Sequence, residues 1–171
     1  MRPRFLWSCL LIGTANLAAP ACRSNAPGRE AQDSTTSPPR LVPLEVLNDR
    51  LAICRSDKDA PLPSWAKTPA GEFFSATRTR DELSIIIANP RAPREAKCER
   101  DWRLLMVKGP LDFNLVGIIA GLSGTLANAG VSIFALSTYD TDYIMVKQPD
   151  LDRALAALRQ AGYPVSQPER L

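Results

Sequence analysis

The clearest hydrophobic pattern lies in the C-terminal part of the chain. Residues 102–107 are an apolar run that ends at Gly109-Pro110, because proline has no amide for a strand ladder. Apolar residues then recur at helical spacing, at positions 115, 118, 119, 122 and 126. Asp112 is suited to cap the start of this helix. The pattern therefore predicts a strand followed by a helix that begins near Asp112.

The next residues predict a hairpin and a second helix. Residues 131–137 and 142–147 are β-prone runs, and residues 138–141 between them form a turn. A stripe of leucines from 151 to 158 predicts a helix that ends at Gly162, before a short edge strand at 163–165. Across 102–166 the order is βαββαβ, the ferredoxin-like arrangement. We therefore expect an α+β fold, with both helices on one face of an antiparallel sheet.

The opposite face of that sheet is not expected to be open to water. In residues 133–136, Ile133 and Ala135 alternate with Phe134 and Leu136, so the run is apolar on both faces. Such a strand is buried on both sides. Either the N-terminal half or a second subunit should cover it.

The N-terminal half has a weaker version of the same pattern. Residues 44–47 and 51–54 predict one long strand with an irregularity near Asn48-Asp49, or a hairpin. Residues 61–65 allow a helical turn at most. Residues 73–79 and 83–87 predict a second hairpin, and residues 90–100 a short helix. We interpret 41–100 as a shortened repeat of the C-terminal unit.

The first 40 residues differ from the rest of the chain. Arg2 and Arg4 precede an apolar stretch, and Cys22 follows small residues, which is typical of a secretory signal or a lipoprotein site. The alternative is a start codon assigned too far upstream. The domain prediction is thus a leader at 1–40, an N-terminal half at 41–100, a C-terminal domain at 101–166 and a tail at 167–171.

Composition narrows the range of functions. The chain has 171 residues and no histidine, which excludes a Ser-His-Asp triad and histidine-ligated metals. The leader has five basic and two acidic residues, which account for the net charge of +3. The remaining chain is electrically balanced, so no basic face for nucleic acid is expected.

Four cysteines are present, at positions 9, 22, 54 and 98. None is close enough to another for a CxxC metal or redox motif. Cys54 lies in an apolar strand and is interpreted as a buried thiol. A Cys54–Cys98 disulfide is compatible only with an exported protein.

The segment from Ser132 to Lys147, with its Ser-Thr-Tyr-x-Thr-Asp-Tyr-x-x-Val motif, resembles the small bacterial tandem ACT-domain proteins. Gly109-Pro110-Leu111-Asp112-Phe113 resembles the entrance to the first ACT helix, and residues 47–54 and 71–75 resemble the family's first half. The resemblance covers about residues 41–166. It extends to the ACT modules of the arginine-sensing CASTOR proteins and, more distantly, of aspartate kinases.

The resemblance implies ligand sensing without catalysis, cofactor or metal. ACT modules bind small metabolites, usually amino acids, where the loop after the first strand meets a neighbouring module. The implied ligand-binding residues come from this loop and from the hairpin turn: Gly109, Pro110, Leu111, Asp112, Ser137, Thr138, Asp140 and Asp142. A helix N-terminus suits a carboxylate, and aspartates suit an ammonium or guanidinium.

Several alternatives remain at this point. Asp112 can be only a helix cap and Asp140 only a turn former, while Tyr139 and Tyr143 suit packing. The protein could be an ACT-fold interaction domain with an empty pocket, or an enzyme that uses the three aspartates. We expect a small amino acid as the ligand, and a cationic amino acid is an open option. A homodimer is also an open option, and the sequence does not identify a protein partner. The expected location is cytoplasmic, with export or a lipoprotein as the alternative.

Overall fold

The computed structural model describes residues 40–167. These residues belong to a single compact unit. The leader predicted at residues 1–40 lies outside the described residues except for Arg40. Residues 168–171 of the predicted tail also lie outside them. The domain limits therefore stay predictions at both ends.

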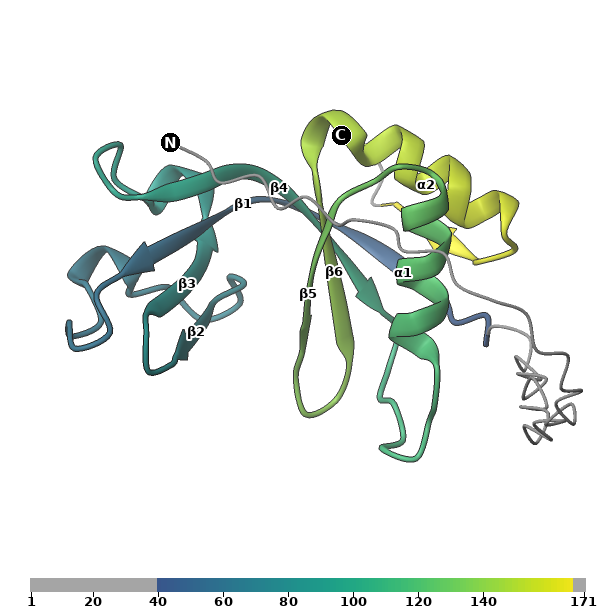
Figure 1. Cartoon of the computed structure of the whole chain (residues 1–171), viewed down its shortest axis with the longest axis horizontal. Helices are drawn as coiled ribbons and strands as arrows, with labels where there is room; N and C mark the ends of the chain where they lie inside the picture. The colour runs from purple at the N-terminus through teal and green to yellow at the C-terminus, as the bar shows by residue number, and fades with distance from the viewer. Residues whose placement is uncertain (1–39, 168–171) are drawn as a thin grey trace, which may run out of the picture. The chain divides into compact units, whose positions relative to one another are not determined.

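The described chain is an α+β structure with two α-helices and three short 3₁₀ turns (Figure 1). Its elements, in chain order, are β1 (Leu44–Ser56), η1 (Ser64–Ala66), β2 (Ser75–Arg78), β3 (Leu83–Ala88), η2 (Asn89–Arg91), β4 (Cys98–Val107), α1 (Ile118–Asn128), β5 (Ile133–Ser137), β6 (Asp142–Lys147), η3 (Gln148–Asp150), α2 (Leu151–Gln160) and β7 (Val165–Ser166).

The strands form one sheet in the order β2-β3-β1-β4-β6-β5, and β7 pairs with β1. All neighbours are antiparallel except β1 and β7, which are parallel. The βαββαβ order predicted for the C-terminal half is confirmed, with β4 as its first strand. The last strand, however, lies beside β1 and not beside β4, because Leu44 of β1 already pairs with Val107.

Strand β1 serves both halves of the sheet. Its first residues pair with the end of β4, and residues 51–56 pair with β3. The register shifts between Val46 and Arg50, which confirms the long strand with an irregularity and not the alternative hairpin. Strand β4 also runs across the domain boundary expected between residues 100 and 101, so that boundary stays a prediction.

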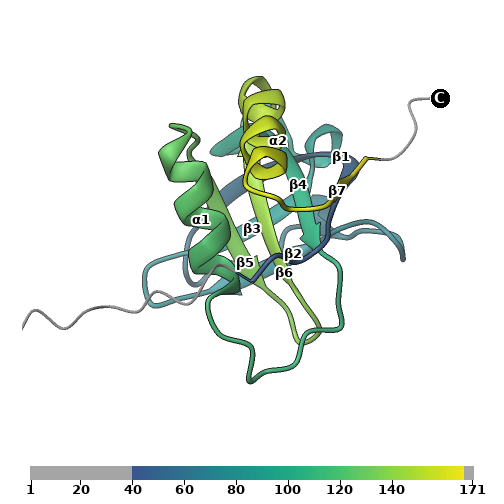
Figure 2. The ribbon, with the colours of Figure 1, turned by 90° about the vertical axis from the view of Figure 1, so that its right-hand side faces the viewer.

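Both helices lie on one face of the C-terminal part of the sheet (Figure 2). Leu122 and Leu126 of α1, and Leu155 and Leu158 of α2, are buried there. They belong to one apolar cluster with the odd-numbered positions at the end of β4, such as Leu105. This burial removes apolar area from water and holds the helices on the sheet.

The opposite face is covered by residues of the N-terminal half. Leu104 and Met145 are fully buried in a cluster that also contains Leu51 and Ile86. The ring of Phe73 lies 5.2 Å from that of Tyr143 in an edge-on contact. The expected cover therefore comes from the same chain, and no second subunit is needed to explain the apolar strands.

The N-terminal half keeps the strands of the repeat but not its helices. The hairpin of β2 and β3 is confirmed, and η1 is the single helical turn expected near residues 61–65. The short helix predicted across 90–100 is wrong: the 3₁₀ turn η2 ends at Arg91, and β4 begins at Cys98. Two prolines, Pro90 and Pro93, remove backbone donors that a longer helix would need.

Candidate ligand-binding site

The loop after β4 and the turn between β5 and β6 lie against each other. The backbone N–H of Leu111 donates to the carbonyl oxygen of Asp140 across 2.8 Å. A Cβ added at Gly109 would lie only 2.8 Å from the same oxygen. Gly109, which precedes a cis bond to Pro110, is therefore needed for the approach of the turn. The space beside the Gly109 backbone is thus taken by the protein's own turn.

The turn is held together by its threonines. Thr138 N–H donates to the Thr141 carbonyl across 2.8 Å, and the Thr141 hydroxyl donates to the Val107 carbonyl across 2.5 Å. Thr141 is buried. The sequence places Thr141 in the turn but assigns it no role of its own, although a threonine in a turn has a hydroxyl that can satisfy a nearby backbone group. Its bond ties the turn to the end of β4.

A depression of about 230 Å³ lies between the loop and the turn. Its lining residues are Leu111, Asp112, Phe113, Leu115, Ile118, Ser137, Thr138, Tyr139, Asp140, Thr141 and Asp142. Six of the eight residues expected to bind ligand are among them, while Gly109 and Pro110 are not. The structure thus brings most of the predicted set together, and their binding role remains a prediction.

Asp112 does not cap a helix, so this part of the sequence prediction is wrong. Helix α1 begins at Ile118, and its N-cap position is Gly117 with φ of 86°. Only glycine adopts such a left-handed conformation readily. The Asp112 carboxylate instead accepts from the backbone and side-chain N–H groups of Asn114 at 2.8 and 2.9 Å. Leu115 fits the helical spacing because it packs on the core from the loop.

The polar groups of the depression are mainly acidic. Asp112, Asp140 and Asp142 line it, and its described wall contains no lysine or arginine. The Ser137 hydroxyl donates to the Asp142 carboxylate across 2.5 Å, which orients that carboxylate at the start of β6. The N-terminal residue of α1, Ile118, is also in the wall. The first backbone N–H groups of a helix have no partner within it and favour negative charge.

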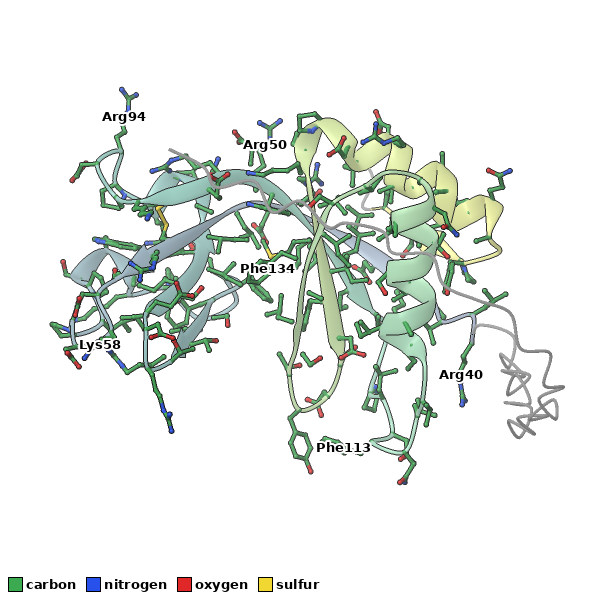
Figure 3. The ribbon with its side chains drawn as sticks, in the orientation of Figure 1. Arg40, Arg50, Lys58, Arg94, Phe113 and Phe134 are labelled. Atoms are coloured by element: carbon green, nitrogen blue, oxygen red, sulfur yellow. A yellow bond between two sulfur atoms is a disulfide. The ribbon has the colours of Figure 1, made fainter. Side chains whose placement is uncertain are left out.

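Two aromatic residues at the rim were not assigned a binding role from the sequence. Phe113 and Tyr139 are 75% and 81% exposed, and their ring centroids lie 5.1 Å apart. One comes from the loop and the other from the turn. Figure 3 shows Phe113 at the tip of the loop that precedes α1. No local pattern could reveal this pair, because it forms only when the loop and the turn meet.

Within residues 40–167, no group of three or more histidine, cysteine, aspartate or glutamate residues could hold a metal ion. The same part of the chain has no helix that is long and apolar enough to cross a membrane. The three aspartates of the depression are thus not part of such a metal-binding group.

Comparison with known proteins places this geometry in a family. The ACT domain model matches residues 97–160, and a model described as an N-terminal domain matches residues 49–95. A human protein, the cytosolic arginine sensor for mTORC1 subunit 1, is 34% identical over 64 residues, which are 36% of this chain and 20% of that protein. This chain therefore spans about a fifth of the length of that curated relative.

Solved structures agree with the family models. A crystal structure of an Agrobacterium tumefaciens protein is similar with a TM-score of 0.70 and 32% identity, covering 76% of this chain and 96% of that one. The regulatory subunit of aspartate kinase from Thermus thermophilus has a TM-score of 0.51 at 12% identity, covering 71% and 99%, and shows the fold alone. The family model, the βαββαβ order and these relatives together show that this chain is an ACT-domain protein, with its ACT domain at residues 97–160, and that it is similar to the CASTOR proteins.

Proposed function

We propose that this chain is a non-catalytic sensor that binds a small amino acid in the depression between the β4–α1 loop and the β5–β6 turn. The observation that carries the proposal is the convergence of Asp112, Asp140 and Asp142 on a depression whose described wall has no basic side chain. An amino acid has an ammonium group that such carboxylates can pair with. Its own carboxylate would take the free N–H groups at the start of α1.

The charge of the depression supports a cationic ligand in particular. Three carboxylates exceed what a single ammonium group needs, so a second positive group on the ligand side chain would be neutralised as well. The human relative is named as an arginine sensor, and this supports the same choice. Pro110 and Gly109 contribute by holding the loop, and Leu111, Ser137 and Thr138 by forming the wall.

Binding would act on the contact between the loop and the turn. Leu111 and Asp140 already join these two segments through the backbone, so a ligand seated between them favours one arrangement of the two. A ligand shifts an equilibrium only by its different affinity for the two states. The readout would be recognised by a protein partner or by a second copy of this chain.

An interaction domain without a ligand is the second candidate. The specific observation in its favour is the exposed ring pair of Phe113 and Tyr139, together with the exposed Val116 on the same loop as Phe113. Exposed apolar groups that cluster mark surfaces for protein partners. In that case the acidic depression would be part of the recognised surface.

A thermal-shift screen of the full chain against the twenty amino acids separates the two candidates. A ligand at about 100 times its dissociation constant adds about 2.7 kcal/mol of stability, which raises Tm by several degrees in a domain of this size. The proposal expects one amino acid, or a group of cationic ones, to do so. An unchanged Tm with all twenty at millimolar concentration would reject it in favour of the interaction domain.

Two variants show whether the shift arises at this site. Asp142→Ala removes a carboxylate of the depression together with its exposed bond to Ser137, and should abolish the ligand-induced shift while the protein still folds. Asp49→Ala removes an exposed carboxylate in the irregular part of β1 and serves as the control that keeps the shift. Equal responses in both variants would place the ligand elsewhere.

A further inference from the structure

The N-terminal half is an ACT-like sheet without helices to cover it. Its strand order, β2-β3-β1-β4, corresponds to that of β5-β6-β4-β1 in the C-terminal half. The two connections that carry α1 and α2 in the C-terminal half contain only the three-residue turns η1 and η2 here. No helix of either connection is therefore available to bury a face of this sheet.

The resulting core is small. Its buried members in the described chain are Ala52, Cys54, Ala66, Leu83, Ile85, Ile87 and Ala92, with Trp65 and Phe74 packed at its edge. Three of these seven are alanines, which bury little apolar area each. The helix-covered cluster of the other half contains sixteen buried residues and includes both helices. A small module with so little core usually needs a covalent or metal cross-link.

The cross-link is present within this core. Cys54 of β1 and Cys98 of β4 are partners in the strand register and form a disulfide, with their Cα atoms 4.0 Å apart. Cys54 is 1% exposed. The two cysteines are separated by 44 residues, and the loop they close contains β2, β3 and both short turns. The disulfide therefore closes a loop that contains both connections without an α-helix.

We propose that the Cys54–Cys98 disulfide replaces the missing helices as the element that stabilises the N-terminal half, and that this protein functions in an oxidising compartment. Closing a loop of this length removes much of the freedom of the unfolded segment. The ion pair between Arg91 and Glu72 in this half stabilises it less than the disulfide does. Both side chains are about one-third exposed, and exposed ion pairs contribute little to stability.

The bond forms by thiol–disulfide exchange. A cysteine thiolate attacks the disulfide of a protein oxidant, and the second cysteine then displaces the reduced oxidant from the mixed disulfide. The two cysteines lose two protons and two electrons in total, and the oxidant becomes a dithiol. Such oxidants act outside the cytosol in most organisms. The Cys54–Cys98 disulfide thus favours an exported protein over a cytoplasmic one.

The compartment is tested on the full chain expressed with its own leader in bacteria. The cells are precipitated with acid, which stops thiol exchange, and the denatured protein is treated with a maleimide polymer that adds mass to each free thiol, before and after reduction. The matched variant Cys54→Ala/Cys98→Ala keeps Cys9 and Cys22 and gives the mass that these two cysteines add by themselves. The proposal expects no added mass at Cys54 and Cys98 until the denatured protein is reduced. Labelling of both residues without reduction would overturn the compartment part.

The structural part is tested on the purified natural chain by comparing the oxidised and reduced protein. We expect reduction to lower Tm by about 10 °C and to raise amide hydrogen exchange in residues 57–97 before residues 118–160. An equal rise in amide hydrogen exchange in both halves, or a Tm unchanged by reduction, would overturn this role. Cys54→Ala/Cys98→Ala should reproduce the reduced protein and lose its response to reductant, which excludes an effect of the reductant itself.

Discussion

The hydroxyl of Thr141 donates a 2.5 Å hydrogen bond to the carbonyl oxygen of Val107, the last residue of β4. The side chain that makes this bond is buried, so the bond is shielded from water. It fixes the β5–β6 turn to the strand from which the site loop departs. The loop and the turn on the two sides of the acidic depression are thus both joined to the buried end of β4.

Thr141→Val should therefore destabilise the protein although it keeps the shape of the side chain. The Val107 carbonyl would lose a buried partner, which costs about 1–3 kcal/mol. Urea unfolding measures the loss. Thr77→Val, on the exposed strand β2, is the matched control and should change the unfolding free energy by less than about 0.5 kcal/mol. Similar losses in both variants would contradict a special role for Thr141.

Gly109→Ala should disturb the site itself. The new methyl group would lie 2.8 Å from the Asp140 carbonyl oxygen and 3.2 Å from the Leu111 nitrogen, both of which are backbone atoms that cannot move independently. We expect a loss of about 1–3 kcal/mol and a weaker response to any ligand of the depression. Denaturant unfolding together with the thermal-shift screen measures both effects.

The control for this variant is Gly124→Ala. Gly124 lies within α1, where an added Cβ meets nothing within 4 Å. Alanine is a better helix former than glycine by about 0.5–1 kcal/mol, so this variant should be more stable than the natural chain. A destabilised Gly124→Ala would contradict the open space beside Gly124, and a neutral Gly109→Ala would contradict the crowding at Gly109.

The contact between the two halves can be measured at Phe73 and Tyr143. Their rings are 5.2 Å apart and join the loop before β2 to strand β6. A double-mutant cycle with Phe73→Leu and Tyr143→Leu should give a coupling energy of about 0.5–1.5 kcal/mol. Trp102 and Phe134, whose centroids are 6.3 Å apart on the same side of the sheet, provide a comparison pair. A coupling energy of zero would mean that the rings do not interact in solution.

The Glu72–Arg91 pair should make stability depend on pH. Two hydrogen bonds of 2.6 and 2.7 Å from the Arg91 guanidinium lower the pKa of the Glu72 carboxyl. In the unfolded chain this pKa returns to the ordinary value of a glutamate side chain. The contribution is therefore complete above the unfolded pKa and disappears as the pH falls through the lower folded pKa.

Urea unfolding between pH 7 and pH 3 checks this expectation. Glu72→Gln should lower stability at pH 7 and should lose part of the decrease seen in acid. Glu95→Gln, which removes an exposed carboxylate from the same half, is the control. The interpretation fails if the natural chain and Glu72→Gln show the same dependence on pH.

Much of the C-terminal half could be predicted because its signals are local. The leucines of α2 repeat at helical spacing and are buried as expected, and the hairpin of β5 and β6 has the strands and the turn that its residues favour. Asp112 shows the limit of this reasoning. Its residue type suits a cap, but the left-handed Gly117 places the helix start five residues later.

What the sequence determined by itself was the order of elements, the buried stripes and the family, since each depends on neighbours along the chain. The tertiary structure alone decided where β1 pairs, which half covers the second sheet face, and that Cys54 lies beside Cys98. It also decided that Phe113 meets Tyr139 across the depression. These relationships join residues far apart in the chain, and closure of the sheet selects them through contacts that no local pattern contains.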